Sequence, residues 1–120
     1  MTQSLEDYLE AIHLAIRDGG AAHVRGVAKA LGVKMPSVVK AVRELRKLGL
    51  VIQDPYSPIE LTAKGKRLAN SVLRRHTLLR SFLIGLGVSE RNADRDACLM
   101  EHILSAETID KIRTHMGSSE

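Results

Sequence analysis

Residues 24–49 read VRGVAKALGVKMPSVVKAVRELRKLG and predict two helices joined by a tight turn. Gly32 accepts the positive φ that such a turn requires, and Ala28 is small where the two helices would cross. Pro36 falls in the first turn of the second helix, where its missing N–H costs no hydrogen bond. An apolar seam at helical spacing is expected from Val27, Leu31, Val33, Val38, Ala41 and Leu45. This pattern is typical of a helix-turn-helix motif.

A wing is expected directly after this motif. Gly49 ends the second helix, and the segments LVIQ and IELT flank the turn-forming segment DPYSP. Two short β-prone runs around a turn rich in Pro and Ser predict a pair of strands. Thr62 then caps a long helix that continues to about residue 87. The chain is therefore expected to be mainly α, with a winged helix-turn-helix domain.

Further helices are expected at both ends of the chain. Ser4 and Asp7 have the spacing of a capping box, which predicts a first helix that runs to the DGG of residues 18–20. Ser89 or Asn92 is expected to open a helix, and Ser105 to cap a last one. The regions before and after the wing are thus both predicted to be helical.

Positive charge is concentrated in the middle of the chain. The formal net charge is only +4 over 120 residues, but the segment from Arg25 to Arg80 holds 13 Lys and Arg and three acids. A basic stretch is often only a solvated helix face, but on a helix-turn-helix it indicates a polyanionic partner. The only aromatic residues are Tyr8, Tyr56 and Phe82, so base stacking on single strands is not expected. Double-stranded DNA is the favoured partner.

Membrane insertion and secretion are not expected. No apolar run approaches the ~20 residues that span a bilayer, and the N-terminus is acidic and amphipathic, unlike a signal peptide. The single cysteine cannot form an internal disulfide, which fits a reducing compartment. We therefore expect a cytoplasmic protein that forms one compact domain, or one small domain with an oligomerisation element.

Three groups that bind metals share one short segment near the C-terminus. In DACLMEHILS, residues 96–105, Cys98, Glu101 and His102 lie on one face if the segment is helical. Three such groups can converge on one cation, although a single helix cannot complete a coordination shell. Cys98 could instead be a small buried hydrophobe, and Glu101 and His102 could be ordinary surface residues.

The order of these segments resembles the family of the diphtheria toxin repressor and the manganese transport regulator. The resemblance rests on SLEDYLEAI, PSV, LTAKG, RRHTLLRSFL and ACLMEHILS, and it spans nearly all of residues 4–110. It implies a homodimeric, metal-activated transcriptional repressor with a DNA-binding domain in residues 1–70. Residues 71–120 would form a helical metal-binding and dimerisation domain, in a short form without the SH3-like domain of longer members.

The resemblance implies a hybrid metal site with the ligands Asp7, Glu10, His76, Cys98, Glu101 and His102. Asp7 and Glu10 match the manganese branch of the family, whereas Cys98 matches the iron branch. Carboxylate and imidazole suit Mn²⁺ and Fe²⁺, and a thiolate shifts preference toward Fe²⁺, Co²⁺ and Zn²⁺. We expect Mn²⁺ or Fe²⁺, with Co²⁺ or Zn²⁺ binding in vitro. The ancillary site of the iron branch would need Glu and His where this chain has Arg80 and Asp94, which argues against a second site of that composition.

The second helix of the motif is expected to enter the major groove of a palindromic operator. Ser37 and Lys40 are candidates for base contact, and Lys34, Met35 and Pro36 lie beside the groove. Phosphate contacts are expected from Arg25, Lys29, Arg43, Lys47 and Lys64. Such contacts position a domain without reading sequence. The half-sites of a homodimer would be about one helical turn, ~34 Å, or a near multiple apart.

Other interpretations remain open at this stage. Taken singly, Asp7 could be only a capping acid, Glu10 a solvated helix residue, and His76 a side chain that faces phosphate or solvent. The chain could also be a metal-independent winged-helix regulator. A thiol enzyme that uses Cys98 with His102 lacks an oxyanion loop and an orienting third residue, and an isolated metal buffer would not need the basic centre. We expect no enzyme activity, no small organic substrate and no membrane partner.

Overall fold

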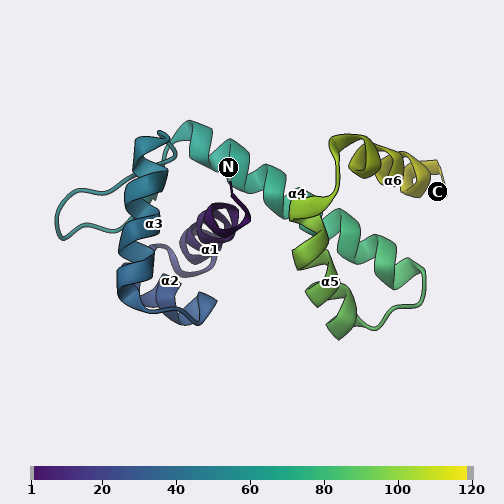
Figure 1. Cartoon of the computed structure of the whole chain (residues 1–120), viewed down its shortest axis with the longest axis horizontal. Coiled ribbons are helices and arrows are strands. Elements are labelled where there is room, and N and C mark those ends of the chain that lie inside the picture. Colours follow the sequence, from purple (N-terminus) through teal and green to yellow (C-terminus); the bar gives the residue numbers. More distant parts are fainter. Residues whose placement is uncertain (1, 119–120) are drawn as a thin grey trace. The chain divides into compact units, whose positions relative to one another are not determined.

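The computed structural model describes residues 2–118 and is mainly helical (Figure 1). Its elements are α1 (Gln3–Gly19), α2 (Val24–Leu31), α3 (Met35–Lys47), β1 (Val51–Ile52), β2 (Glu60–Leu61), α4 (Ala63–Gly85), α5 (Glu90–Ile103) and α6 (Ala106–Ser118). Two compact units meet between Asn70 and Ser71, within α4. The first unit contains α1 to α3, both strands and the beginning of α4, which confirms the winged helix-turn-helix fold.

The first helix begins earlier than the sequence pattern predicts. Thr2, not Ser4, is its N-cap, and the Thr2 hydroxyl accepts a hydrogen bond of 3.2 Å from the Leu5 amide. At the other end Gly20 has a φ of 83° and its amide donates to the Ile16 carbonyl, as expected from the glycine pair. Because the cap is two residues earlier, Asp7 does not occupy the third helical position of a capping box.

The turn between α2 and α3 has the predicted geometry. Gly32 adopts a φ of 66° and caps α2, and Pro36 lies in the first turn of α3. One expected member of the apolar seam is wrong: Val33 is 38% exposed, because it follows the left-handed Gly32 and lies in the connection itself. Val42, which the seam prediction omitted, is buried instead.

The wing is a two-stranded antiparallel sheet that is anchored to the start of α4. Val51 pairs with Leu61, and both strands fall inside the predicted segments but are only two residues long. The Thr62 hydroxyl accepts a hydrogen bond from the Gly65 amide at 3.0 Å and donates one to the Gly49 carbonyl at 2.7 Å. Thr62 therefore caps α4, as expected, and also ties this helix to the end of the helix-turn-helix.

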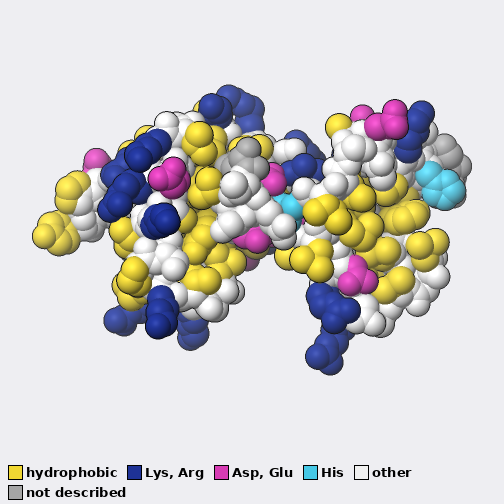
Figure 2. Space-filling view, viewed as in Figure 1, with side chains coloured by type: hydrophobic (Ala, Val, Ile, Leu, Met, Phe, Trp, Pro, Cys, Tyr) yellow, Lys and Arg dark blue, Asp and Glu magenta, His cyan; other side chains and the backbone are white. Residues whose placement is uncertain are grey.

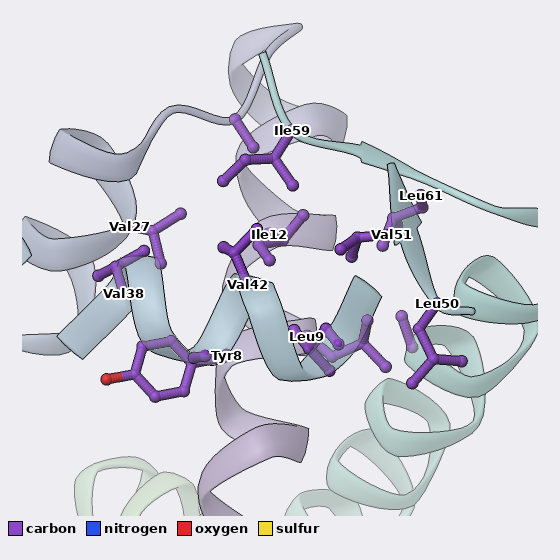
Figure 3. Packing of buried hydrophobic residues seen from close by; sticks show 14 of the residues in the cluster. Tyr8, Leu9, Ile12, Val27, Val38, Val42, Leu50, Val51, Ile59 and Leu61 are labelled. Carbon is purple, nitrogen blue, oxygen red and sulfur yellow. The ribbon is translucent and has the colours of Figure 1, made fainter. Parts of the chain in front are cut away.

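The core of the first unit is aliphatic and draws on every element around it. In Figure 3, Leu9 and Ile12 of α1, Val38 and Val42 of α3, and the wing residues Val51, Ile59 and Leu61 point toward one another. Tyr8 lies at the edge of this cluster with its hydroxyl directed away from it. The packing fixes α1 against α2 and α3, so the exposed face of α3 is set by residues far from it in sequence.

The second unit holds the rest of α4 together with α5 and α6. Leu79 of α4, Ala97 of α5 and Ile109 of α6 form its buried centre. The Ser89 hydroxyl accepts from the Asn92 amide at 3.3 Å and caps α5, and Ser105 caps α6 through the Thr108 amide at 3.1 Å. Within residues 2–118, no helix combines the length and the apolar character that crossing a bilayer requires.

Replacing Gly65 by Ala should strongly destabilise the first unit. A Cβ at Gly65 would overlap the backbone carbonyl oxygen of Leu50, and neither backbone can move without breaking the link between wing and α4. We expect a loss of about 2–3 kcal/mol or more in the free energy of unfolding, measured by urea denaturation. Gly26→Ala is the matched control, because a Cβ there meets no atom within 4 Å and should stabilise α2 by ~0.5–1 kcal/mol. Equal stability of the two variants would contradict the close approach.

Candidate metal centre and nucleic-acid interface

The six expected metal ligands come from three helices. Asp7 and Glu10 lie on α1 in the first unit. His76 is in the middle of α4 and the other three, Cys98, Glu101 and His102, are on α5, so these four belong to the second unit.

The carboxylate of Glu101 lies between two imidazole rings. Its Oε2 is 3.1 Å from Nδ1 of His76, and its Oε1 is 3.2 Å from Nε2 of His102. The Glu101 side chain is 0% exposed, that of His102 is 1% exposed and that of His76 is 21% exposed. The alternative that Glu101 and His102 are ordinary surface residues is therefore wrong. Burying a carboxylate is costly unless positive charge or hydrogen bonds compensate it.

The spacing of these atoms fits ligands that share one ion. His76 Nδ1 is buried and makes no hydrogen bond among the described residues, although Glu101 Oε2 is only 3.1 Å away. Two ligands about 2.1 Å from one ion, at ~90–110° to each other, are about 3.0–3.4 Å apart. An imidazole nitrogen and a carboxylate oxygen are both common ligands of divalent transition metals. The residues present thus fit a cation of this class.

Cys98 lies one turn before this pair on α5. Its side chain is exposed and makes no disulfide, so the alternative of a small buried hydrophobe is wrong. The i, i+3 and i+4 spacing places the thiol on the same side of α5 as Glu101 and His102.

The two acids of α1 differ in their surroundings from ordinary solvated helix residues. Asp7 is partly buried and, with the cap at Thr2, has no capping-box role. Oε2 of Glu10 is buried and lacks a hydrogen-bond partner among the described residues. A buried carboxylate oxygen of this kind calls for a donor or a cation.

The two ancillary positions form an ion pair with each other. Nε of Arg80 lies 2.6 Å from Oδ1 of Asp94. A guanidinium has no lone pair that could ligate a cation. The carboxylate of Asp94 is thus paired with the permanent positive charge of Arg80.

The residues expected to touch DNA share the exposed surface of the helix-turn-helix. All ten lie in the first unit with exposed side chains: Arg25, Lys29, Lys34, Met35, Pro36, Ser37, Lys40, Arg43, Lys47 and Lys64. Figure 2 shows Lys and Arg side chains along the visible face of α3. Two of them also make local contacts, since Lys47 lies 3.7 Å from Glu44 and Lys64 donates to the Leu48 carbonyl at 3.4 Å.

One residue of this surface was missed by the sequence analysis. Val39 is 45% exposed on α3, between Pro36 and Lys40. The signal was present, because Val39 lies about 100° around the helix from the buried Val38. An exposed apolar side chain in this position can contact a thymine methyl group.

Comparison with known proteins covers the whole chain. Residues 1–59 match the family model described as the N-terminal DNA-binding domain of iron-dependent repressors. Residues 62–120 match the model of the metal-binding and dimerisation domain of the same repressors.

Several relatives are similar over most of their length. The transcriptional regulator MntR of Geobacillus kaustophilus is 41% identical over 111 residues, which cover 92% of this chain and 79% of that protein. An uncharacterised transcriptional regulator of Methanocaldococcus jannaschii is 37% identical over 118 residues, which cover 97% of this chain and 94% of that protein.

Solved structures agree in fold. The metal-dependent regulator MtsR has a TM-score of 0.86 at 28% identity, over 98% of this chain and 55% of that one. A manganese-dependent transcriptional repressor in complex with manganese has a TM-score of 0.84 at 29% identity, over 94% of this chain and 52% of that one. This chain thus spans about half the length of these two solved regulators. The chain belongs to the iron-dependent repressor family and is a metal-dependent, DNA-binding transcriptional repressor.

Proposed function

We propose that this repressor binds its operator when Mn²⁺ or Fe²⁺ occupies a site formed by Asp7, Glu10, His76, Cys98, Glu101 and His102. The observation that carries the proposal is the buried Glu101 carboxylate, with one imidazole nitrogen 3.1 Å from one oxygen and another 3.2 Å from the second. The metal-binding domain of the family, matched over residues 62–120, contains four of these six residues.

The donor set favours ions of intermediate softness. Carboxylates and imidazoles suit Mn²⁺ and Fe²⁺, and two of the similar solved structures are named as a manganese regulator and a manganese-dependent repressor. The exposed thiol of Cys98 adds a soft ligand, which raises the relative affinity for Fe²⁺, Co²⁺ and Zn²⁺. Co²⁺ and Zn²⁺ are therefore expected to bind in vitro.

The two acids of α1 give the site its regulatory role in this proposal. Asp7 and Glu10 are one turn apart on a helix that packs against α2 and α3. Carboxylates brought together without a cation repel one another, and a bound divalent ion supplies the positive charge that offsets this repulsion. Ordering of α1, and of the helix-turn-helix packed on it, then depends on occupancy of the site.

On DNA, α3 is proposed to lie in the major groove. Ser37 and Lys40 would contact base edges, beside Lys34, Met35, Pro36 and the exposed Val39. Phosphates would be held by Arg25, Lys29, Arg43, Lys47 and Lys64. A symmetric dimer that presents two such helices reads a palindrome.

The dimer contact is proposed to use the second unit. Leu86, Leu99 and Ile103 are large apolar side chains that are exposed there, and Figure 2 shows hydrophobic side chains gathered over α5 and α6. Large exposed apolar side chains that gather on one surface are typical of a protein–protein interface. The family model that matches residues 62–120 describes a metal-binding and dimerisation domain.

Glu101→Gln should abolish the metal response without harming the metal-free fold. The substitution keeps the size and shape of the buried side chain and leaves an amide that can still hydrogen-bond to the imidazoles, so the metal-free variant should stay folded. At 100 times the dissociation constant, Mn²⁺ should stabilise the parent by about 2.7 kcal/mol and the variant much less, measured by thermal unfolding. Glu107→Gln, at an exposed position of α6, is the control. Operator binding by the parent, measured by fluorescence anisotropy, should require Mn²⁺ or Fe²⁺. If a chelator leaves the affinity for the operator unchanged, the chain is a metal-independent regulator.

Cys98→Glu should shift the metal preference toward Mn²⁺, because a hard carboxylate replaces a soft thiolate. The measurement is the ratio of Mn²⁺ to Zn²⁺ affinity, obtained by competition with a chromophoric chelator. Cys98→Ser removes the thiolate without adding charge and should fall between the parent and Cys98→Glu. An unchanged ratio in all three proteins would show that Cys98 is not a ligand.

Lys40→Ala and Arg43→Ala should impair DNA binding in different ways. Loss of a base contact at Lys40 should cost about 1–3 kcal/mol and relax the preference for operator over unrelated DNA. Loss of a phosphate contact at Arg43 should weaken binding to both DNAs alike and reduce the salt slope by about 1. Lys111→Ala, on α6, is the control. If Lys40→Ala lowers the affinity for operator and for unrelated DNA equally, Lys40 contacts phosphate and not a base.

A further inference from the structure

The loop between β1 and β2 carries a tyrosine in a backbone conformation that favours glycine. Tyr56 has a φ of 61° and is the only non-glycine residue with a positive φ among residues 2–118. The Ser57 amide donates to the Asp54 carbonyl at 3.0 Å, so Pro55 and Tyr56 are the two central residues of a tight turn. Glycine or asparagine is usual at the second central position when φ is positive there. For a bulky residue this conformation costs stability.

No packing within the first unit compensates for this cost. The Tyr56 side chain is completely exposed, at 109%, and the loop extends away from the helices of its unit (Figure 1). The turn is also held by the Gln53 side chain, which donates to the Ser57 carbonyl at 3.3 Å. A large aromatic ring that a strained turn holds in solvent indicates a contact with another molecule.

The charge of the wing favours a protein over DNA as the molecule that Tyr56 contacts. Residues 48–63 contain no Lys or Arg, and their two acids, Asp54 and Glu60, are both exposed. Surfaces that bind DNA carry net positive charge, because contacts with phosphates dominate the affinity. An acidic loop with an aromatic tip is instead complementary to an apolar groove flanked by cations.

A groove of this kind lies between α4 and α6 in the second unit. It has a volume of about 750 Å³, and its apolar lining consists of Leu73, Leu78 and Met116. Its charged lining consists of Arg74 and Arg113, without an acid. Arg113 pairs with Asp110 at 2.9 Å, whereas Arg74 is exposed and makes no ion pair within residues 2–118. The groove therefore offers an apolar surface and at least one available cation.

We propose that the wing tip of one copy of this chain docks into the α4–α6 groove of a second copy, with the Tyr56 ring on the apolar lining and Asp54 facing Arg74. Thr77 and Ser81 also line the groove, and their hydroxyl groups can hydrogen-bond to the phenol. The two surfaces are different, so the contact can repeat from one copy to the next.

The size of the contact determines where it acts. A single loop covers much less surface than the ~1,200–2,000 Å² of a stable protein–protein interface, so it cannot hold two copies together in dilute solution. Copies that are bound side by side on DNA have a high effective concentration, at which a weak contact is made. The expected result is cooperative binding to adjacent operators, and in this respect the inference rests on the operator binding proposed above.

The first test places a photoreactive benzoylphenylalanine at position 56 of the full chain. This variant is mixed with ¹⁵N-labelled parent, bound with Mn²⁺ to DNA that carries two adjacent operators, and irradiated. Mass spectrometry should find cross-links from position 56 to labelled peptides that contain residues 73–81 or 113–116. The same group at Glu107, which is exposed on α6 and outside the groove, is the control and should not give these products. Cross-links only to DNA or to other surfaces, or none, would overturn the proposal.

The second test measures cooperativity as the ratio of the affinities for DNA with two adjacent operators and with one, at operator spacings varied over one helical turn. A change in general DNA affinity cancels in this ratio. Asp54→Lys and Arg74→Glu should each lower it by about 1.5–5-fold, as expected for an exposed ion pair, and the double variant should recover part of the loss. Glu107→Lys makes the same change of charge on α6 and should leave the ratio unchanged. An equal loss in Glu107→Lys, or no recovery in the double variant, would refute the pairing of wing and groove.

Tyr56→Gly separates the contact from stability. Glycine adopts a φ of 61° without strain, so the midpoint of thermal unfolding should not fall. The cooperativity should nevertheless be lost, because the ring is absent. Parental cooperativity in Tyr56→Gly would contradict the proposal.

The docking proposal and the proposed function fail in different ways. If operator binding does not require Mn²⁺ or Fe²⁺, the proposed metal-dependent function fails, whereas the affinity ratio measured without metal still decides whether the wing docks. If operator binding requires metal but the ratio shows no cooperativity, only the docking proposal fails.

Discussion

A carboxylate that is removed from water must be compensated, and the chemistry of this protein follows from that constraint at Glu101. Among the described residues, Glu101 is the only Asp, Glu, Lys or Arg in the buried class. A hydrophobic residue of similar size would pack there at lower cost. The fold instead places one imidazole nitrogen at each carboxylate oxygen, which provides two neutral or singly charged partners and an arrangement suited to a doubly charged ion.

The fold of the first unit explains how a change at α1 can reach the DNA-binding surface. Leu9 and Ile12 of α1 share one buried cluster with Val38 and Val42 of α3 (Figure 3), so the position of α3 depends on α1. Only the exposed face of α3, with its basic side chains and Val39, is left for a partner. One helix thus carries two proposed metal ligands on one side and the support of α3 on another.

Local signals in the sequence were sufficient for most of the fold, because they act within a few residues. The left-handed turn after α2 requires a residue such as Gly32, Pro36 suits the first turn of a helix, and Thr62 caps α4. The predictions that were wrong concern the residue that caps α1 and one member of the apolar seam. Thr2 caps α1 although Ser4 has the better capping-box spacing, and Val33 is exposed although it is apolar. The convergence of His76 with Glu101 was expected only from family resemblance, since no periodicity relates two residues on different helices.

The pairing of Arg80 with Asp94 could not have been predicted from either residue alone. It gives the carboxylate of Asp94 a cationic partner within the protein. Each is unremarkable on an amphipathic helix, and only the packing of α4 on α5 brings Nε within 2.6 Å of Oδ1. A guanidinium is positively charged at every physiological pH, so the charge that balances Asp94 never depends on solution conditions. The charge that balances Glu101, by contrast, can be supplied by an exchangeable ion.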